Sequence, residues 1–317
     1  QFSVLPNSLR QQLDGYFCQS QISHELNNLT PGIVQKASDG NTIKTLFHLR
    51  DNLDVEAVLM RYSDRRTLCI STQAGCAMGC VFCATGQMGF NRHLSSGEII
   101  EQVLYYARQL SALGEQVTNV VIMGMGEPFH NYDATMQAID RLNHAQGYNF
   151  GARRFTISTV GLIPVIRRFT EEHRQVNLAI SLHASNNELR SSLLPINRKY
   201  PLEELLASCL DYVRTTHRRI TFEWALIHDV NDGPEYALQL AHLLQVFRLG
   251  GASLCHVNVI PLNPTPNYPG KATTRQKAIA FREVLERLNI PCTIRLRRGI
   301  DIQAGCGQLA TQALSNK

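Results

Sequence analysis

Short apolar runs alternate with longer amphipathic runs along most of this chain. Runs rich in β-branched residues predict buried strands, and apolar residues spaced three or four positions apart predict helices. The expected strands are residues 67–71, 117–123, 155–160, 176–182, 220–227, 254–260 and 292–296. The expected helices between them are residues 95–113, 132–144, 163–170, 201–216, 234–247 and 274–288.

This order is strand then helix, six times over, which predicts an α/β fold with a parallel sheet and right-handed crossovers. A doubly wound sheet and an open or closed barrel both fit the pattern. No GxGxxG follows the first strand, which disfavours a dinucleotide-binding fold. In both architectures the chemistry lies beyond the carboxyl ends of the strands.

The first 65 residues follow a different pattern. Residues 5–29 predict a helix, with Leu5, Leu9, Leu13 and Phe17 at helical spacing. Residues 42–49 and 54–62 then alternate like the two strands of a hairpin. We therefore expect residues 1–65 to form a helical piece with a β extension, and residues 66–317 to form the main domain.

Composition indicates an enzyme of a reducing compartment, the cytoplasm. The chain has 317 residues, 44% of them hydrophobic, and no apolar run approaches the length of a membrane span. We find no secretory signal in the sequence, which begins at Gln1. Three of the nine cysteines are clustered, which favours free thiols over a disulfide framework.

The net charge of +5 is carried by 25 arginines against six lysines. Guanidinium groups suit phosphate, so the charge is compatible with nucleic acid, although an arginine bias arises equally from genome composition. Candidate phosphate contacts are the pairs Arg153–Arg154 and Arg218–Arg219 and the triplet Arg295, Arg297 and Arg298, each of which also fits a solvated surface.

The sharpest motif is a run of three cysteines, Cys76-x3-Cys80-x2-Cys83, directly after the first predicted strand. Three thiolates around an open position suit a 4Fe–4S cluster whose fourth iron is free to bind S-adenosylmethionine. The alternative is a zinc site completed by Cys69 or His93. The cluster is favoured because structural zinc sites usually show two separated ligand pairs.

Polar and glycine residues recur just beyond the other strands. Because the carboxyl ends of parallel strands share one edge of a sheet, we expect these residues to bind the cofactor together. One such residue alone would be a cap or a turn, but several around one rim favour a site. The set is Gly126, Glu127, Ser158, Ser181, Leu182, His183 and Asn263.

The C-terminal segment holds a second candidate nucleophile. Cys306 lies between Gly305 and Gly307, shortly after three arginines, and nothing around it looks like a buried helix or strand face. We expect the cationic field to favour its thiolate and the glycines to let the sulfur move. Cys69, on the strand that leads to the cysteine run, is a candidate thiol for Cys306 to meet.

Together these motifs resemble the RlmN/Cfr family of radical S-adenosylmethionine RNA methyltransferases, over almost the whole chain. The chain departs from the family pattern at Gly305, where alanine is usual, and in a shorter N-terminal helical region. The motifs that carry the resemblance are residues 69–83, 86–92, 124–128, 131–133, 181–184, 231–232 and 301–309.

The resemblance implies a partial (β/α)6 TIM-type barrel and two S-adenosylmethionine molecules per turnover. One molecule methylates Cys306; the other binds the open iron and yields a 5′-deoxyadenosyl radical that takes hydrogen from the new methyl group. The methylene then adds to an adenine carbon, and Cys69 releases the product by closing a disulfide with Cys306. The resemblance also assigns Glu56 as a proton acceptor; from sequence alone Glu56 would be a surface carboxylate on a strand.

The implied substrate is C2 of an adenine in 23S rRNA, with tRNA as a second substrate. The alternative within the family is C8 of the same adenine, a modification that confers antibiotic resistance. Flavodoxin or ferredoxin would supply electrons, and we expect a monomer that does not bind membranes. Two rivals from other classes are a glycyl-radical activase, which shares the cysteine spacing, and a zinc-stabilised RNA-binding module.

Overall fold

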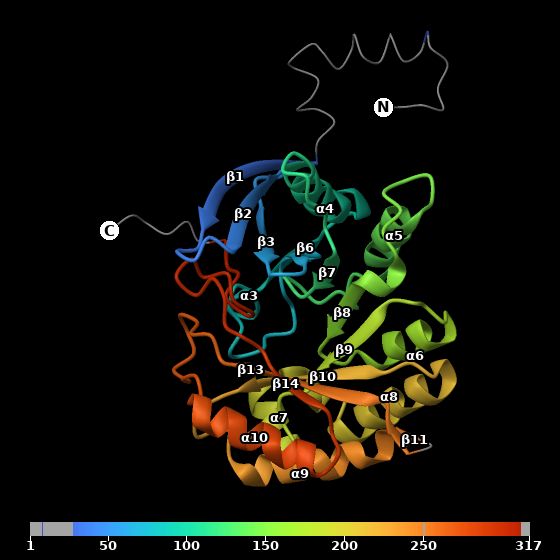
Figure 1. Ribbon diagram of the computed structural model, residues 1–317, viewed down its shortest axis with the longest axis vertical. Coiled ribbons are helices and arrows are strands. Elements are labelled where there is room, and N and C mark those ends of the chain that lie inside the picture. The colour runs from blue at the N-terminus through green and yellow to red at the C-terminus, as the bar shows by residue number, and fades with distance from the viewer. Residues whose placement is uncertain (1–7, 9–27, 250, 312–317) are drawn as a thin grey trace.

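The computed structural model describes residue 8, residues 28–249 and residues 251–311 (Figure 1). Apart from Ser8 and residues 28–29, the helix predicted over residues 5–29 lies outside the described residues, as do Leu5, Leu9, Leu13 and Phe17. Leu29 already belongs to a strand, so the predicted helix does not extend to that residue.

One ten-stranded sheet organises the described chain. Strands β1, β2, β3 and β4 lie in this order, each antiparallel to the next, and from β4 onward every pairing is parallel. In sheet order the strands are β1 (Leu29–Lys36), β2 (Thr42–Leu49), β3 (Asp54–Arg61), β4 (Arg66–Cys69), β7 (Asn119–Ile122), β8 (Phe155–Thr159), β9 (Asn177–Ser181), β10 (Ile220–Leu226), β13 (Cys255–Pro261) and β14 (Cys292–Ile294).

The parallel strands follow one another in chain order, so the sheet has no point at which the winding reverses. A doubly wound sheet needs such a reversal, so that alternative is wrong. No pairing joins β14 to β1 or β4 among the described residues, so the barrel is open. Six strand–helix units followed by β14 confirm the predicted partial (β/α)6 barrel.

The crossover helices lie along one side of the curved sheet, while the C-terminal segment and the short helix α3 (Ala84–Gln87) lie on the other (Figure 1). Both faces of the parallel strands are therefore covered, as continuous apolar strand sequences require. The crossover helices are α4 (Ser96–Ser111), α5 (Tyr132–Asn143), α6 (Ile163–Glu171), α8 (Leu202–Thr216), α9 (Pro234–Leu244) and α10 (Arg275–Arg287).

Helix α4 fixes the approach to the cysteine run. It begins at a capping box in which the Ser95 hydroxyl accepts from the Glu98 N–H and the Glu98 carboxylate accepts from the Ser95 N–H. Its buried Gln102 accepts from the Ser71 N–H at 2.8 Å and donates to the Ser71 carbonyl at 2.9 Å. The chain leaving β4 is therefore held by a paired amide instead of a sheet partner.

Several short elements carry no strong sequence signal and were not predicted. Strand β1 extends the expected hairpin to three strands, and its many exposed positions explain the weak apolar pattern. The others are β5 (Gln73–Gly75), β6 (Phe90–His93), α7 (Asn187–Leu193), η1 (Ala152–Arg154), η2 (Pro195–Arg198), η3 (Gln245–Phe247), β11 (Arg248–Leu249) and β12 (Ala252–Ser253).

The sheet continues across residue 65, because Val58 of β3 pairs with Cys69 of β4. The division into residues 1–65 and 66–317 stays a prediction. No helix in the described part of the chain is long and apolar enough to cross a membrane.

Candidate active site

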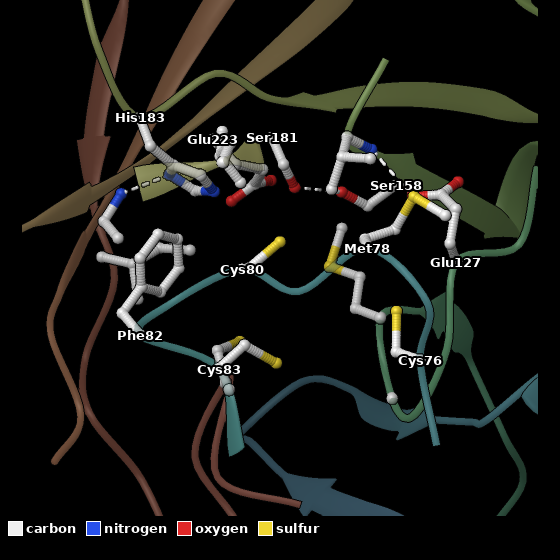
Figure 2. Close-up of a pocket in the computed structure, with 18 of the residues that line it drawn as sticks. Cys76, Met78, Cys80, Phe82, Cys83, Glu127, Ser158, Ser181, His183 and Glu223 are labelled. Carbon is white, nitrogen blue, oxygen red and sulfur yellow. Dashed lines mark hydrogen bonds between the residues drawn. The ribbon is translucent and has the colours of Figure 1, made fainter. Parts of the chain in front are cut away.

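The cysteine run forms a loop between the small antiparallel strands β5 and β6. The Cys76 N–H donates to the Gly89 carbonyl at 2.7 Å, which closes the base of this loop. Figure 2 shows the loop along one side of a cavity, facing Ser158, Ser181, His183 and Glu223 on the other side. The strand ends and the cysteine loop therefore enclose one space.

That cavity, of about 150 Å³, brings together most of the predicted site. Its wall is mainly apolar, with a small number of polar groups, as is usual for cofactor sites. Of the predicted residues it is lined by Cys76, Cys80, Cys83, Gly126, Glu127, Ser158, Ser181, His183, Asn263 and Cys306.

The three cysteines fit an iron–sulfur cluster better than a single zinc ion. Zinc–sulfur bonds of about 2.3 Å place tetrahedral sulfurs about 3.8 Å apart. Among the described residues, the one group of three candidate ligands with all ligand atoms within 4.8 Å is His228, Asp229 and Asp232, so the cysteine sulfurs are spaced more widely.

The proposed fourth zinc ligands also lie elsewhere. Cys69 does not line this cavity, and His93 Nδ1 is 2.9 Å from the Gln73 amide nitrogen. Burial raises the pKa of Cys76 to about 12 and that of Cys80 well above its ordinary value. Thiolates at these positions therefore need a cationic partner, which iron supplies.

Glu127 presents a buried carboxylate at the end of the second parallel strand. Its Oε1 accepts from the Phe129 N–H at 2.9 Å and its Oε2 from the Val160 N–H at 2.8 Å. Burial raises its pKa to about 7 despite these donors. Gly126 before it has φ of +100°, and a Cβ there would lie 2.5 Å from Gln73, so the turn requires glycine.

The next two strands supply hydroxyl groups and an imidazole. Ser158 Oγ and Ser181 Oγ lie 3.3 Å apart across β8 and β9. His183 Nδ1 accepts from the Ala225 N–H at 2.8 Å, which leaves Nε2 as the protonated nitrogen. Burial lowers the pKa of His183 to about 3, so the ring is neutral at physiological pH.

Leu182 does not line the cavity, and its side chain is fully buried in the core. Its backbone N–H donates to the Glu223 carbonyl at 3.1 Å. The predicted role of Leu182 in cofactor binding can therefore involve only its main chain.

Asn263 holds the C-terminal loop. Its Nδ2 donates to the Cys306 carbonyl at 3.0 Å, and its Oδ1 accepts from Arg297 Nε at 3.2 Å. A Cβ on Gly305 would lie 2.6 Å from Asn263 Nδ2, so alanine at this position would require a shift. The Gly307 carbonyl accepts from the Ala84 N–H at 2.7 Å, which joins this loop to the end of the cysteine run.

Cys306 is exposed and lines a second cavity as well as the first. Cys69 and Arg295 line the second cavity, so the two thiols predicted to meet face one space. Arg295 Nη1 is 4.0 Å from Cys306 Sγ and lowers its pKa, but desolvation outweighs this effect and the net shift is upward. Arg295 therefore favours the thiolate, as the cationic segment predicted, although desolvation leaves the pKa of Cys306 above its ordinary value.

Glu56 lies on β3 and is buried, which corrects the expectation of a surface carboxylate. Its Oε1 pairs with Lys44 Nζ at 2.9 Å, and its Oε2 accepts from the Ala310 N–H at 3.1 Å. Glu56 lines neither cavity, but it contacts the segment that carries Cys306.

Sequence reasoning missed two buried charged residues. Glu223 is 4% exposed, lines the first cavity and accepts from Asn258 Nδ2 with both carboxylate oxygens. The sequence feature that could have identified Glu223 is a single acidic residue inside an apolar strand sequence. Arg190 is 0% exposed, and its mostly polar sequence neighbours gave no sign that it would be buried.

Both arginine pairs lie at the end of the parallel strands that is opposite to the cavity. Arg153 and Arg154 directly precede β8, and Arg218 and Arg219 directly precede β10. They therefore lie at the amino ends of parallel strands, whereas the cavity lies at the carboxyl ends. Arg153 and Arg218 both contact Gln175, which fits a solvated surface.

Comparison with known proteins gives the family. The model of the Radical SAM superfamily matches residues 70–241. A probable dual-specificity RNA methyltransferase RlmN from Chloroflexus aurantiacus is 50% identical over 282 residues, covering 87% of this chain and 75% of the relative. The chain belongs to the RlmN family of radical SAM RNA methyltransferases.

Other RlmN relatives and solved structures agree. Dual-specificity RNA methyltransferase RlmN 1 from Myxococcus xanthus is 52% identical, covering 86% of this chain and 74% of the relative. The crystal structure of a radical SAM methyltransferase from Sphaerobacter thermophilus matches with a TM-score of 0.88 and 49% identity, over 97% of this chain and 86% of that chain. Membership of the RlmN family leaves the glycyl-radical activase and the zinc-stabilised module without support.

The radical SAM family implies S-adenosylmethionine and a 4Fe–4S cluster, and Cys76, Cys80 and Cys83 are present to hold it. The eight cysteines among the described residues are all free thiols.

Proposed function

We propose that this chain methylates C2 of an adenine in 23S rRNA, with tRNA as a second substrate. A relative from Nitrosopumilus maritimus, 46% identical, is named ribosomal RNA large subunit methyltransferase N, and the relatives above are named dual-specificity enzymes. C8 is the alternative target, as in the resistance branch of the wider family. Since the curated relatives carry RlmN names, C2 is the favoured position.

The observation that carries the proposal is the position of Cys306. It lines the cavity of the three cysteines and also the cavity that contains Cys69. A thiol that receives a methyl group on one side and a disulfide partner on the other needs this placement. Ordinary displacement cannot methylate an electron-poor adenine carbon, so a cysteine that carries the methyl group meets a chemical requirement.

In this proposal Cys76, Cys80 and Cys83 hold the cluster, and two S-adenosylmethionine molecules are used per turnover. When bound, the cluster and its cofactor supply a 5′-deoxyadenosyl radical. The protein's own groups orient the cofactor and exclude water from it. Those groups are Gly126, Glu127, Ser158, Ser181, the Leu182 backbone, His183 and Asn263.

Cys306 carries the methyl carbon to the base, and Cys69 then bonds to the Cys306 sulfur to release the methylated product. Glu56 is the proposed proton acceptor. Its hydrogen bond from the Ala310 N–H supports this role, because it ties the carboxylate to the segment that carries Cys306. The Lys44 ammonium pairs with the other carboxylate oxygen at 2.9 Å, so both oxygens of Glu56 are held in place.

We further propose that the protein works as a monomer in the cytoplasm, where thiols stay reduced. Flavodoxin or ferredoxin would deliver the electron, and residues 1–65 would add contacts to RNA. The target base must leave its stack to enter the site, as in other base-modifying enzymes.

The test is anaerobic turnover of reconstituted protein with S-adenosylmethionine and an rRNA fragment, followed by mass spectrometry of the digested nucleosides. 2-Methyladenosine is the expected product, and 8-methyladenosine would move the chain to the other branch. Cys306→Ala is expected to retain iron and lose the methylated base. The control Cys292→Ala, on β14 outside both cavities, is expected to keep both.

Protein that cleaves the cofactor but methylates neither rRNA nor tRNA would contradict the proposed substrate. Protein that loads no iron would contradict the proposed cofactor.

A further inference from the structure

A buried arginine that has no acidic partner among the described residues contacts the ends of β8 and β9. Arg190, on α7, is 0% exposed. Its guanidinium donates to the Val160 carbonyl at 2.7 Å, the Leu182 carbonyl at 3.3 Å and Asn197 Oδ1 at 2.9 Å. Each acceptor is neutral, and no carboxylate in the described part of the chain forms an ion pair with Arg190.

An unpaired buried charge is costly, because the carbonyl dipoles replace hydration only in part. Burial lowers the pKa of Arg190 to about 10, which still leaves it protonated at neutral pH. If this position needed only to donate hydrogen bonds to these carbonyl groups, a neutral amide side chain could do so. The retained cation therefore indicates an anion nearby that is supplied from outside the polypeptide.

A candidate position for that anion is the site of the three cysteines. The Val81 N–H, between Cys80 and Cys83, donates to the Leu193 carbonyl of α7 at 3.1 Å. Cys80 packs in one buried cluster with Leu193 and Val160. The Arg190 guanidinium, which donates to the Val160 carbonyl, therefore lies beside residues that pack against Cys80.

A cluster held by three thiolates carries a net charge of about −1 when its core is oxidised, and one-electron reduction makes this about −2. A fixed cation in a water-excluded wall stabilises the more negative state more strongly. The reduction potential of such a cluster depends on the net charge around it. Arg190 lies where it would raise this potential.

We propose that Arg190 is a positioning residue that supplies the counter-charge of the cluster and makes its one-electron reduction easier. Its hydrogen bonds also tie Val160, just after β8, to Ser181 and Leu182 at the end of β9. One residue thus couples the redox site to the cofactor strands. This inference rests on the cluster assigned above to Cys76, Cys80 and Cys83.

The experiment is an anaerobic redox titration of reconstituted protein without S-adenosylmethionine, read by the EPR signal of the reduced cluster. Iron and sulfide are measured first, so that failure to form a cluster is recognised separately. Arg190→Met removes the charge, and Arg190→Lys keeps it but loses the planar fork. Arg168→Met is the control, since Arg168 is an exposed arginine of α6 that pairs with Asp133.

A fourth variant keeps Arg190 and neutralises it. Asn197→Asp places a carboxylate at the position of the oxygen that now accepts from Arg190 Nη1 at 2.9 Å. This change is isosteric, so it preserves the volume of the core. It remains informative if Arg190→Met fails to fold.

Arg190→Met and Asn197→Asp are expected to lower the ratio of reduced to oxidised cluster, at fixed applied potential, by about tenfold. For a one-electron couple this corresponds to about 59 mV. Arg190→Lys and Arg168→Met are expected to stay near the wild-type ratio. A merely structural role instead predicts that lysine and methionine behave alike, because both lack the planar fork.

The inference is overturned if cluster-loaded Arg190→Met or Asn197→Asp titrates like the wild type. It is also overturned if Arg190→Lys shifts as far as Arg190→Met. Wild-type protein without iron would instead contradict the cluster itself.

Discussion

Asn263 donates a hydrogen bond from its side-chain amide to the backbone carbonyl of Cys306, with Nδ2 and O 3.0 Å apart. Asn263 follows the sixth parallel strand, whereas Cys306 lies in the C-terminal segment. The contact places Cys306 over the carboxyl ends of the strands. It also joins a residue predicted to bind the cofactor to the residue predicted to receive its methyl group.

Asn263→Ala is expected to loosen the Cys306 loop. One hydrogen bond contributes about 1 kcal/mol, which corresponds to roughly fivefold more frequent opening. Hydrogen–deuterium exchange of residues 303–309 should therefore accelerate about fivefold. Asn143→Ala is the control, because Asn143 also donates one side-chain hydrogen bond to a carbonyl, that of Phe150, but far from this loop. Equal exchange in both variants would contradict the prediction.

Cys69→Ala is expected to trap RNA on the protein. Without the second thiol the bond between Cys306 and the base has no route to release, so a covalent adduct should accumulate in place of free product. Denaturing gel electrophoresis with labelled RNA measures it. Cys209→Ala removes a buried helix cysteine that lines neither cavity and should turn over normally. An adduct-free Cys69→Ala enzyme that still releases methylated RNA would rule out the disulfide step.

Glu56→Ala should destabilise the fold by about 3–5 kcal/mol, because it leaves the Lys44 ammonium buried without its partner. Urea unfolding followed by circular dichroism gives this difference. The double variant Lys44→Met with Glu56→Ala should recover part of the loss.

The control for this pair is Asp133→Ala, which breaks an exposed ion pair to Arg168 and should cost less than about 1 kcal/mol. A loss for Glu56→Ala no larger than that of the control would show that the buried pair contributes little.

His183 should make the free energy of unfolding depend on pH. Its pKa is lowered by burial from 6.5 to about 3, so as pH falls the unfolded chain takes up the proton first. The contribution of His183 is fully present above about pH 6.5 and is lost progressively toward pH 3. Each pH unit in that window corresponds to about 1.4 kcal/mol.

The difference in unfolding free energy between wild type and His183→Gln should shrink by about 2 kcal/mol from pH 6.5 to pH 5. Urea unfolding in the presence of a reductant, at several pH values, measures it. The exposed His242→Gln provides the matched control. A difference that stays constant with pH would mean that the buried ring accepts a proton without penalty.

Much of the barrel could be predicted because its strands are buried on both faces and read as apolar runs. The capping box at Ser95 and Glu98 likewise depends on neighbours three residues apart and was predicted correctly. The short elements were not predicted because no local apolar pattern marks them. Helix α7 and strand β5 are held by contacts with distant segments, such as the bond from Val81 to Leu193, and not by local pattern.

The candidate site shows the same difference between features set by local sequence and features set by distant segments. The spacing of Cys76, Cys80 and Cys83 is a local property, so sequence predicted the cluster ligands. The environment of Glu56 is not local, because Lys44 and Ala310 reach it from an adjacent strand and from the C-terminal segment. The net pKa of Cys306 depends on both Arg295 and desolvation, and sequence gave the charge without the desolvation.

By itself, the sequence determined the α/β order, the three-cysteine motif and the family, since each depends on residue types at short, fixed spacings. Only the tertiary structure decided that the sheet is open, that Cys306 faces two cavities, and that Arg190 has no acidic partner among the described residues. These features arise where segments far apart in the chain pack together. Burial and electrostatic pairing depend on distance in space, which the linear order of residues does not specify.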